Sequence, residues 1–224
     1  TRPHSIYCSF FLLTVRRAPR STHGISSAAS DGYKGQPDKH KRISDLIQRK
    51  YNLKVKKYTS AKKIAQDYGQ AIFELMNEAY QPLYGYSALS QRQIDQYVKM
   101  YLPILDLRMV TLITDADDQL LAVGISMPSL AEALQKAHGR LLPMGWYHLA
   151  KTIFLKKYPK MLDLLLVAVK PEYQNKGVNA LLFSDLIPVY QQLGFEYAES
   201  NPELELNGKV QAQWEYFKTE QHKR

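Results

Sequence analysis

A short polar loop between two regular apolar segments contains the residues of this sequence best suited to chemistry. The run LLLVAV at 164–169 leads into the loop Pro171–Asn179, and an apolar stripe of helical spacing follows it. The first amides of a helix lack intrahelical partners, and the helix dipole adds about half a positive charge there. Gly177 lets the backbone approach a phosphate where a Cβ would obstruct it, while Gln174 and Lys176 offer side-chain donors. The pattern predicts a pyrophosphate cradle, and it also fits an ordinary strand–helix turn.

Other common catalytic motifs are absent from the sequence. No two of the eleven glycines are separated by one residue, which excludes the dinucleotide fingerprint G-x-G-x-x-G. H-E-x-x-H, G-x-S-x-G and C-x-x-C do not occur, and the six histidines are scattered. The single cysteine, Cys8, excludes internal disulfides and fits a reducing compartment. The sequence therefore predicts no metal site and a cytoplasmic location.

Hydrophobic spacing predicts the elements that position the loop. Strands are expected at 53–57, 109–114, 120–127, 161–169 and 195–200, and helices around 43–51, 64–79, 90–101, 129–138, 146–157, 178–193 and 208–219. The acidic turn DADDQ joins two of these strands as a hairpin, and a strand–loop–helix–strand unit comes later. This order predicts an α/β fold with a mixed, mostly antiparallel central sheet and helices on both faces.

The net charge of +9 is a property of the N-terminal part of the chain. Residues 1–63 hold fifteen Lys or Arg and three acids, whereas residues 64–224 hold fifteen and eighteen. A basic groove through the folded body is therefore not expected, and neither is a nucleic-acid partner. Residues 1–42 are basic and lack sustained periodicity, which predicts a disordered segment, leader or linker before a domain at 43–224. The apolar runs are too short for a membrane span, and no membrane partner is expected.

The segment LLLVAVKPEYQNKGVNALLF resembles the acetyl-CoA-binding segment of the GCN5-related N-acetyltransferases. That family has the signature Gln/Arg-x-x-Gly-x-Gly/Ala after its fourth strand, and Gln174, Gly177 and Asn179 occupy the three defined positions. Asn179 departs from the usual Gly or Ala. The predicted order of elements over residues 53–219 is also similar to that of the family. Two strands that normally close the fold are missing after the last expected helix, so the sequence resembles a domain truncated at its C-terminus, with a further domain possible upstream.

The resemblance implies an enzyme that transfers an acetyl group from acetyl-CoA, its co-substrate, to an amine acceptor by direct attack. It implies that CoA contacts the end of the central strand and the loop, through Val167, Val169, Gln174, Asn175, Lys176, Gly177, Val178 and Asn179. In many members a tyrosine of the last helix protonates the departing thiolate, which makes Tyr216 the candidate acid. Glu199, on the strand where acceptors approach in this family, is the candidate base. The acceptor is expected between the segments 77–87 and 139–148.

Two alternatives remain open on the sequence alone. Asn179 and the missing strands also fit a degenerate, non-catalytic domain of the same fold that binds CoA or serves as a scaffold. The basic N-terminal segment would permit a nucleic-acid-binding protein, which requires affinity that falls steeply with salt.

Overall fold

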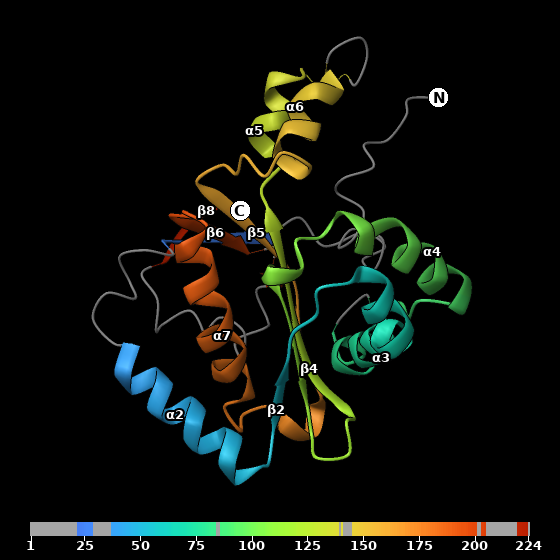
Figure 1. The fold of residues 1–224 in the computed structure, drawn as a ribbon, viewed down its shortest axis with the longest axis vertical. Helices are drawn as coiled ribbons and strands as arrows, with labels where there is room; N and C mark the ends of the chain where they lie inside the picture. Colours follow the sequence, from blue (N-terminus) through green and yellow to red (C-terminus); the bar gives the residue numbers. More distant parts are fainter. Residues whose placement is uncertain are drawn as a thin grey trace.

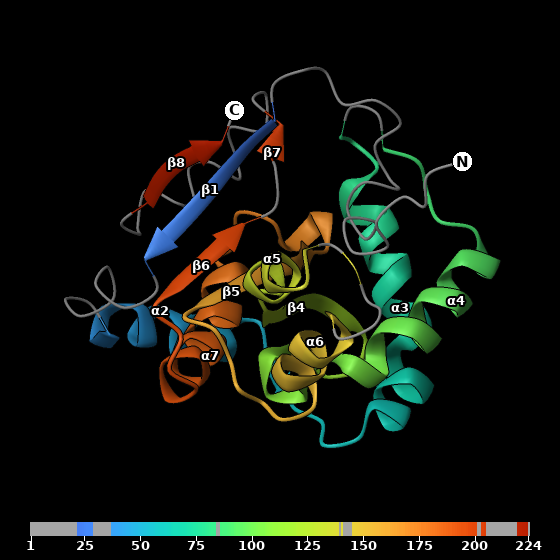
Figure 2. The same ribbon diagram turned by 90° about the horizontal axis from the view of Figure 1, so that it is seen from above.

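The structure is a computed structural model that describes residues 22–28, 37–83, 86–138, 140, 145–200, 203–204 and 219–223. In these residues, the central sheet has eight strands. Their order is β2 (Lys54–Lys56), β3 (Val110–Thr114), β4 (Leu120–Pro128), β5 (Met161–Val169), β6 (Tyr197–Ser200), β1 (Thr22–Ala28) and β7 (Glu203–Leu204), with β8 (Thr219–Lys223) paired to β1. All neighbours run antiparallel except β5 and β6, which run parallel. Strands β6, β1, β7 and β8 extend the sheet away from β4 (Figure 2).

Helices cover both faces of this sheet (Figure 1). They are α2 (Pro37–Lys50), α3 (Ala61–Tyr80), α4 (Gln91–Tyr101), α5 (Ala131–Lys136), α6 (Gly145–Ile153) and α7 (Val178–Gln192), with short 3₁₀ turns at η2 (Leu102–Ile104), η3 (Leu107–Met109) and η4 (Pro171–Tyr173). Helices α3 and α4 pack against Leu112 and Val123, whereas α7 packs against Ile113 and Leu121. Because neighbouring strand residues point to opposite faces, the apolar runs of β3 and β4 supply both cores. The predicted fold class is confirmed.

A β-bulge in the middle of β5 changes the face of the sheet toward which its side chains point. Residues 125 and 126 of β4 pair with Leu166 and Leu164, so Leu165 is an extra residue on β5. Since side chains alternate along a strand, this bulge places Leu164 in the core below α7 and Leu166 in the core below α3. Strand β5 therefore contributes apolar side chains of the same parity to both cores.

The main predicted elements from β2 to β6 are confirmed, and the differences lie at the two ends of the chain. Strand β1 falls inside the segment 1–42, and α2 begins at Pro37. The segment THGISSA of β1 has no apolar alternation, so its extended form comes from backbone pairing with β6, β7 and β8. The helix expected at 208–219 is wrong at Thr219, because Thr219 begins β8. The rest of the expected helix, residues 208–218, lies outside the residues that the structure describes. The domain boundary at residue 42 stays a prediction.

Candidate functional site

Half of β5 has one edge that the described sheet does not cover. Strand β6 pairs with residues 161–164 only, ending at the pair of Leu164 with Ser200. The amide of Lys170 donates to the carbonyl of Leu121 on β4 at 2.8 Å. Backbone groups alternate between the two edges of a strand, so those of Val167 and Val169 face away from β4. The structure thus presents the backbone of these two predicted binding residues along an edge that leads to the loop.

Two side chains already bond carbonyls at this edge. The Tyr80 hydroxyl donates to the carbonyl of Val167 at 2.9 Å, and Nε2 of Gln174 donates to the carbonyl of Val169 at 3.1 Å. Gln174 therefore ties the loop back to the strand, instead of pointing a donor outward as the sequence suggested. Tyr80 belongs to the expected acceptor segment 77–87, but sequence reasoning did not single it out. The only signal was its position in a loop rich in tyrosine.

Gly177 caps the N-terminus of α7 in the left-handed conformation, with φ of 81°. A Cβ at Gly177 would also overlap the end of the Ile47 side chain on α2. The backbone geometry thus favours glycine here independently of any ligand, and a side chain at this position would also require Ile47 to move. In the first turn of α7, the amide of Ala180 donates to the Gly177 carbonyl at 2.9 Å. No backbone partner is described for the amides of Val178 and Asn179. Those two amides form the donor end of the helix, as the cradle prediction requires.

Lys176 of the loop lies over two aromatic rings. The Lys176 ammonium lies 4.8 Å from the ring centroid of Tyr173 and 5.5 Å from that of Tyr51. Asn175 is exposed and adopts a left-handed conformation with φ of 63°, and Asn179 is half-buried in the first turn of α7. Lys176 therefore supplies a positive charge beside the helix N-terminus, held by cation–π contacts.

A cavity of about 540 Å³ lies at the other end of β5. It is bounded by the loop before α3, the turns η2 and η3, the end of β4 and the end of α6, and its lining is largely apolar. Met127 and Pro128, two of its lining residues, pair with Asp163 and Leu162 at the start of β5. The cavity and the loop are therefore separated by about the length of the strand, roughly 25 Å at 3.3 Å per residue.

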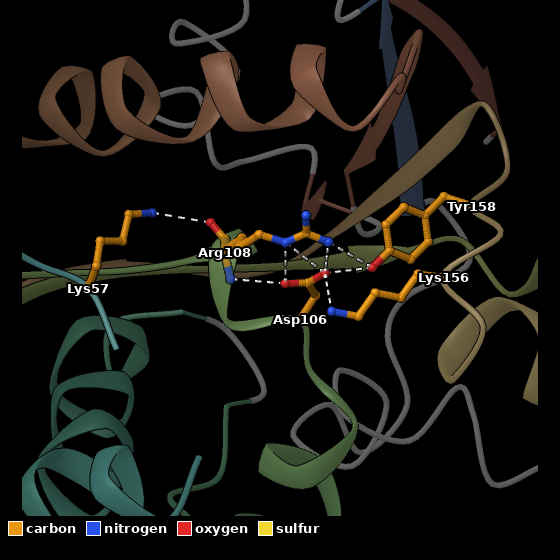
Figure 3. Close-up of polar contacts among 5 residues, drawn as sticks. All are labelled: Lys57, Asp106, Arg108, Lys156 and Tyr158. Carbon is orange, nitrogen blue, oxygen red and sulfur yellow. Dashed lines mark hydrogen bonds and ion pairs between the residues drawn. The ribbon is translucent and has the colours of Figure 1, made fainter. Parts of the chain in front are cut away.

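The polar wall of this cavity is built around Asp106 (Figure 3). Its carboxylate, 7% exposed, accepts from Arg108 Nη2 at 2.6 Å and from the Tyr158 hydroxyl at 2.5 Å, and Lys156 Nζ lies 3.9 Å away. Burial alone would raise the pKa of Asp106, but the hydrogen bonds from Arg108 and Tyr158 outweigh burial and hold that pKa well below its usual range. Burial, followed by the bond to Asp106, raises the pKa of Tyr158 to about 12.

Lys57 extends this polar wall toward α7. Its ammonium donates to the carbonyl of Arg108 at 3.2 Å and pairs with Asp185 of α7 at 2.6 Å (Figure 3 shows the first contact). Asp185 also accepts from the Thr111 hydroxyl at 2.5 Å. Sequence reasoning missed Asp106, Arg108 and Tyr158, because Tyr158 lies 52 positions from Asp106 along the chain and only the fold brings the two together.

The structure describes one of the two predicted catalytic residues, and the roles of both stay predictions. Glu199 lies half-buried on β6, where it is the parallel register partner of Asp163 on β5. It therefore sits next to the point at which the two strands separate. Tyr216 lies outside the described residues, so its role stays a prediction. Within the described residues, no three His, Cys, Asp or Glu side chains gather as metal ligands would, and none of the helices has the length and apolar composition needed to cross a bilayer.

Comparisons with known proteins agree with the fold. No family model matches the sequence. The bacterial ceramide synthase of Caulobacter vibrioides is 27% identical over 113 residues, covering 50% of this chain and 29% of that protein. A GCN5-related N-acetyltransferase from Sphaerobacter thermophilus superposes with a TM-score of 0.51 at 10% identity, over 90% of this chain and 50% of that one.

A second solved structure gives a similar result. The GCN5-related glucosamine N-acetyltransferase region of a fungal multi-domain GH3 β-N-acetylglucosaminidase superposes with a TM-score of 0.50 at 11% identity, over 92% of this chain and 20% of that one. The chain thus spans at most half the length of these three proteins. Together with the sheet order, the separation of β5 from β6 and the helix after the loop, these likenesses show that the chain has the fold of the GCN5-related N-acetyltransferases.

Proposed function

We propose that this chain is an N-acyltransferase that moves an acyl group, acetyl in the simplest case, from acyl-CoA to an amine. The observation that carries the proposal is the edge of β5 at Val167 and Val169, which leads directly to the N-terminus of α7. The carbonyls of this edge already accept from Tyr80 and Gln174. The groups that it offers to an extended chain containing amides are therefore its backbone N–H groups, and a helix N-terminus offers N–H groups to phosphates. Coenzyme A carries a pyrophosphate and an arm with two amides, so both features fit one molecule.

The two substrates would meet near the middle of β5. The bulge at Leu165 lies four residues from either end of the strand, about 13 Å at 3.3 Å per residue. A donor anchored at the loop and extended along the edge reaches this point from one side. An acceptor that enters through the cavity reaches it from the other side, so each substrate has its own approach.

The proposed reaction is direct attack by the amine on the thioester carbonyl. The C–N bond forms, the C–S bond breaks, the amine loses a proton and the thiolate of CoA gains one. Glu199 is the proposed acceptor of the amine proton, because it lies where β5 and β6 separate. Tyr80, whose hydroxyl lies at the exposed edge, joins Tyr216 as a candidate donor to the thiolate.

The likeness to the ceramide synthase favours a narrower form of this proposal, in which the acceptor is a lipid amine and the acyl group is long. A ceramide is the amide of a fatty acid with a long-chain amino alcohol, so its synthesis is N-acylation. The largely apolar lining of the cavity, which includes Leu105, Met127 and Ile153, suits an aliphatic chain.

Calorimetry with CoA, acetyl-CoA and palmitoyl-CoA on the full chain tests donor binding. We expect binding that Lys176→Glu weakens about tenfold, since the reversal places a negative charge beside the helix N-terminus. Lys99→Glu, on the exposed face of α4, is the matched control and should bind as the parent does. Release of free CoA thiol, measured with and without sphinganine or a small amine, then tests transfer.

The outcomes distinguish three hypotheses: an acyltransferase, a non-catalytic CoA-binding domain, and a protein without the proposed CoA site. Binding with amine-dependent thiol release supports the transferase. Binding without release from any amine favours a non-catalytic CoA-binding domain. Absence of binding to all three donors would rule out the proposed site.

A further inference from the structure

Exposed apolar side chains gather on one small part of the molecule. Trp146, Tyr147, Phe154 and Leu155 are between 47% and 70% exposed. They make up half of the large hydrophobic residues that the described structure exposes, and all four fall within ten consecutive positions. A concentration of this kind on a monomeric protein marks a surface for interaction.

These side chains lie on the outer side of a helical projection. Helices α5 and α6 stand out from the end of the sheet (Figure 1), and they pack on each other through Leu130, Ala133 and Leu149. The amide of Phe154 donates to the carbonyl of Ala150 at 2.8 Å, so the helical path of α6 continues through it. At 100° per residue, Tyr147 and Phe154 lie about 20° apart and at least 140° from Leu149, whereas Trp146 lies about 60° from Leu149 at the border of that face. The exposed residues are therefore not needed for the small core of the projection.

The projection is also rich in basic residues. Residues 131–160 hold six Lys or Arg and one acid, Glu132, whereas the rest of 64–224 holds nine and seventeen. Lys156 and Lys157 directly follow the exposed Phe154 and Leu155, and Lys151 lies on α6 itself. Positive charge thus lies beside the exposed apolar side chains. The segment 37–63, which contains α2 and β2, is a second basic region, with ten Lys or Arg and two acids.

We propose that the α5–α6 projection docks on the surface of an anionic phospholipid bilayer. Trp146, Tyr147, Phe154 and Leu155 would lie at the boundary between headgroups and acyl chains, where amphipathic aromatic rings are favoured. The lysines would lie among the phosphates, which attract basic side chains near the surface. Lysine is depleted at protein–protein interfaces, so its abundance here favours a lipid surface over a protein partner.

The cavity strengthens the choice of a membrane. Phe154 and Lys156 line it, so its wall is continuous with the exposed face of the projection. A molecule docked in this way would place the cavity beside the lipid headgroups. The docking itself does not depend on the proposed acyl transfer, and it differs from the sequence-based expectation, which included no membrane partner.

Vesicle flotation of the full chain tests the proposal. We expect binding to vesicles of phosphatidylcholine with about one third phosphatidylglycerol, and much weaker binding to phosphatidylcholine alone. The double substitution Trp146→Ala with Phe154→Ala should reduce binding at least tenfold, and Lys151→Glu with Lys157→Glu by a similar factor at low salt. Met100→Ala with Lys99→Glu, an exposed pair on α4, is the matched control.

The fluorescence of Trp146 locates the contact. In a Trp214→Phe background, where Trp146 is the remaining tryptophan, its emission should shift to shorter wavelength when anionic vesicles are added. Binding that persists in the Trp146 and Phe154 variant would overturn the proposal, since it would assign the lipid contact to another basic region such as residues 1–63. Absence of vesicle binding, with a dimer that the same variant abolishes, would overturn it in favour of a protein interface.

Discussion

The two ends of β5 differ in what they offer a substrate. At the loop end, the backbone provides the functional groups: the edge at Val167 and Val169 and the first amides of α7. At the cavity end, side chains provide them, with Asp106 buried among Arg108 and Tyr158. A backbone site depends on conformation, so glycine geometry and packing control it. A site made of charged side chains depends on pairing and burial, so pH controls it.

A substitution at Gly177 should have the largest effect at the loop end. Gly177→Val forces a β-branched residue into a left-handed conformation and against Ile47, which should lower the free energy of unfolding by about 3 kcal/mol. Gly194→Val is the matched control, because Gly194 has the same φ of 81° but no atom within 4 Å of the point where a Cβ would lie. Denaturant unfolding compares the two.

Ile47→Ala in the Gly177→Val background should restore part of the loss, because it removes the side chain that the new valine meets. Equal destabilisation by the two valine substitutions, without rescue, would show that the contact with α2 carries no energy. A loss of acyl-CoA binding by Gly177→Val alone would then need correction for stability before it is assigned to the cradle.

At the cavity end, Asp106→Asn should lower stability by about 1–2 kcal/mol at pH 7, because the charged hydrogen bonds from Arg108 and Tyr158 to the carboxylate are lost while Arg108 and Lys156 stay solvated. The pKa of Asp106 is lower in the folded state than in the unfolded chain, so its contribution is present above about pH 4 and is lost as the pH falls below that value. The difference between variant and parent should therefore shrink below pH 4. Asp95→Asn, an exposed change on α4, should show no such trend in thermal unfolding measured against pH.

Tyr80→Phe tests whether the edge hydroxyl does more than hold the strand. Loss of its bond to the Val167 carbonyl should cost about 1 kcal/mol of stability, whereas Tyr147→Phe at an exposed position should cost little. If Tyr80 also protonates the thiolate, the rate of CoA release should fall at least tenfold while donor affinity stays within about twofold. A variant with unchanged turnover would limit Tyr80 to a structural role.

The smallest effect is expected from two threonines of β3. Thr114 Oγ1 is buried without a hydrogen-bond partner in the described structure, so Thr114→Val should be neutral or stabilise by up to about 1 kcal/mol. Thr111, nearer the cavity, contacts Asp185 and Lys57, and Thr111→Val should instead destabilise by about 1–2 kcal/mol. A thermal melt of each variant measures this contrast between the two ends of one strand.

The fold was largely predictable where apolar spacing is regular. The runs at β3, β4 and β5 and the stripe of α7 specify buried strands and a covering helix without any knowledge of tertiary contacts. Strand β1 could not be predicted, because histidine, glycine and serine in THGISSA carry no strand pattern and the pairing partner is about 170 residues away.

One part of the candidate site could likewise be predicted from the sequence, and another part could not. The loop could be predicted because its parts are adjacent in sequence and its key residue is a glycine. The Asp106 cluster could not, because Tyr158 comes from a separate segment and only tertiary structure brings it to the carboxylate. The inward turn of Gln174 was also hidden, since a signature gives the residue type but not the direction of the side chain.

The extra residue at Leu165 has a consequence for how the sequence can change over time. Residues of the same parity on its two sides belong to different cores, so Leu162 and Leu164 are selected by α7 while Leu166 and Ala168 are selected by α3. We therefore expect substitutions at Leu162 and Leu164 to be compensated by changes on α7, and substitutions at Leu166 and Ala168 to be compensated by changes on α3.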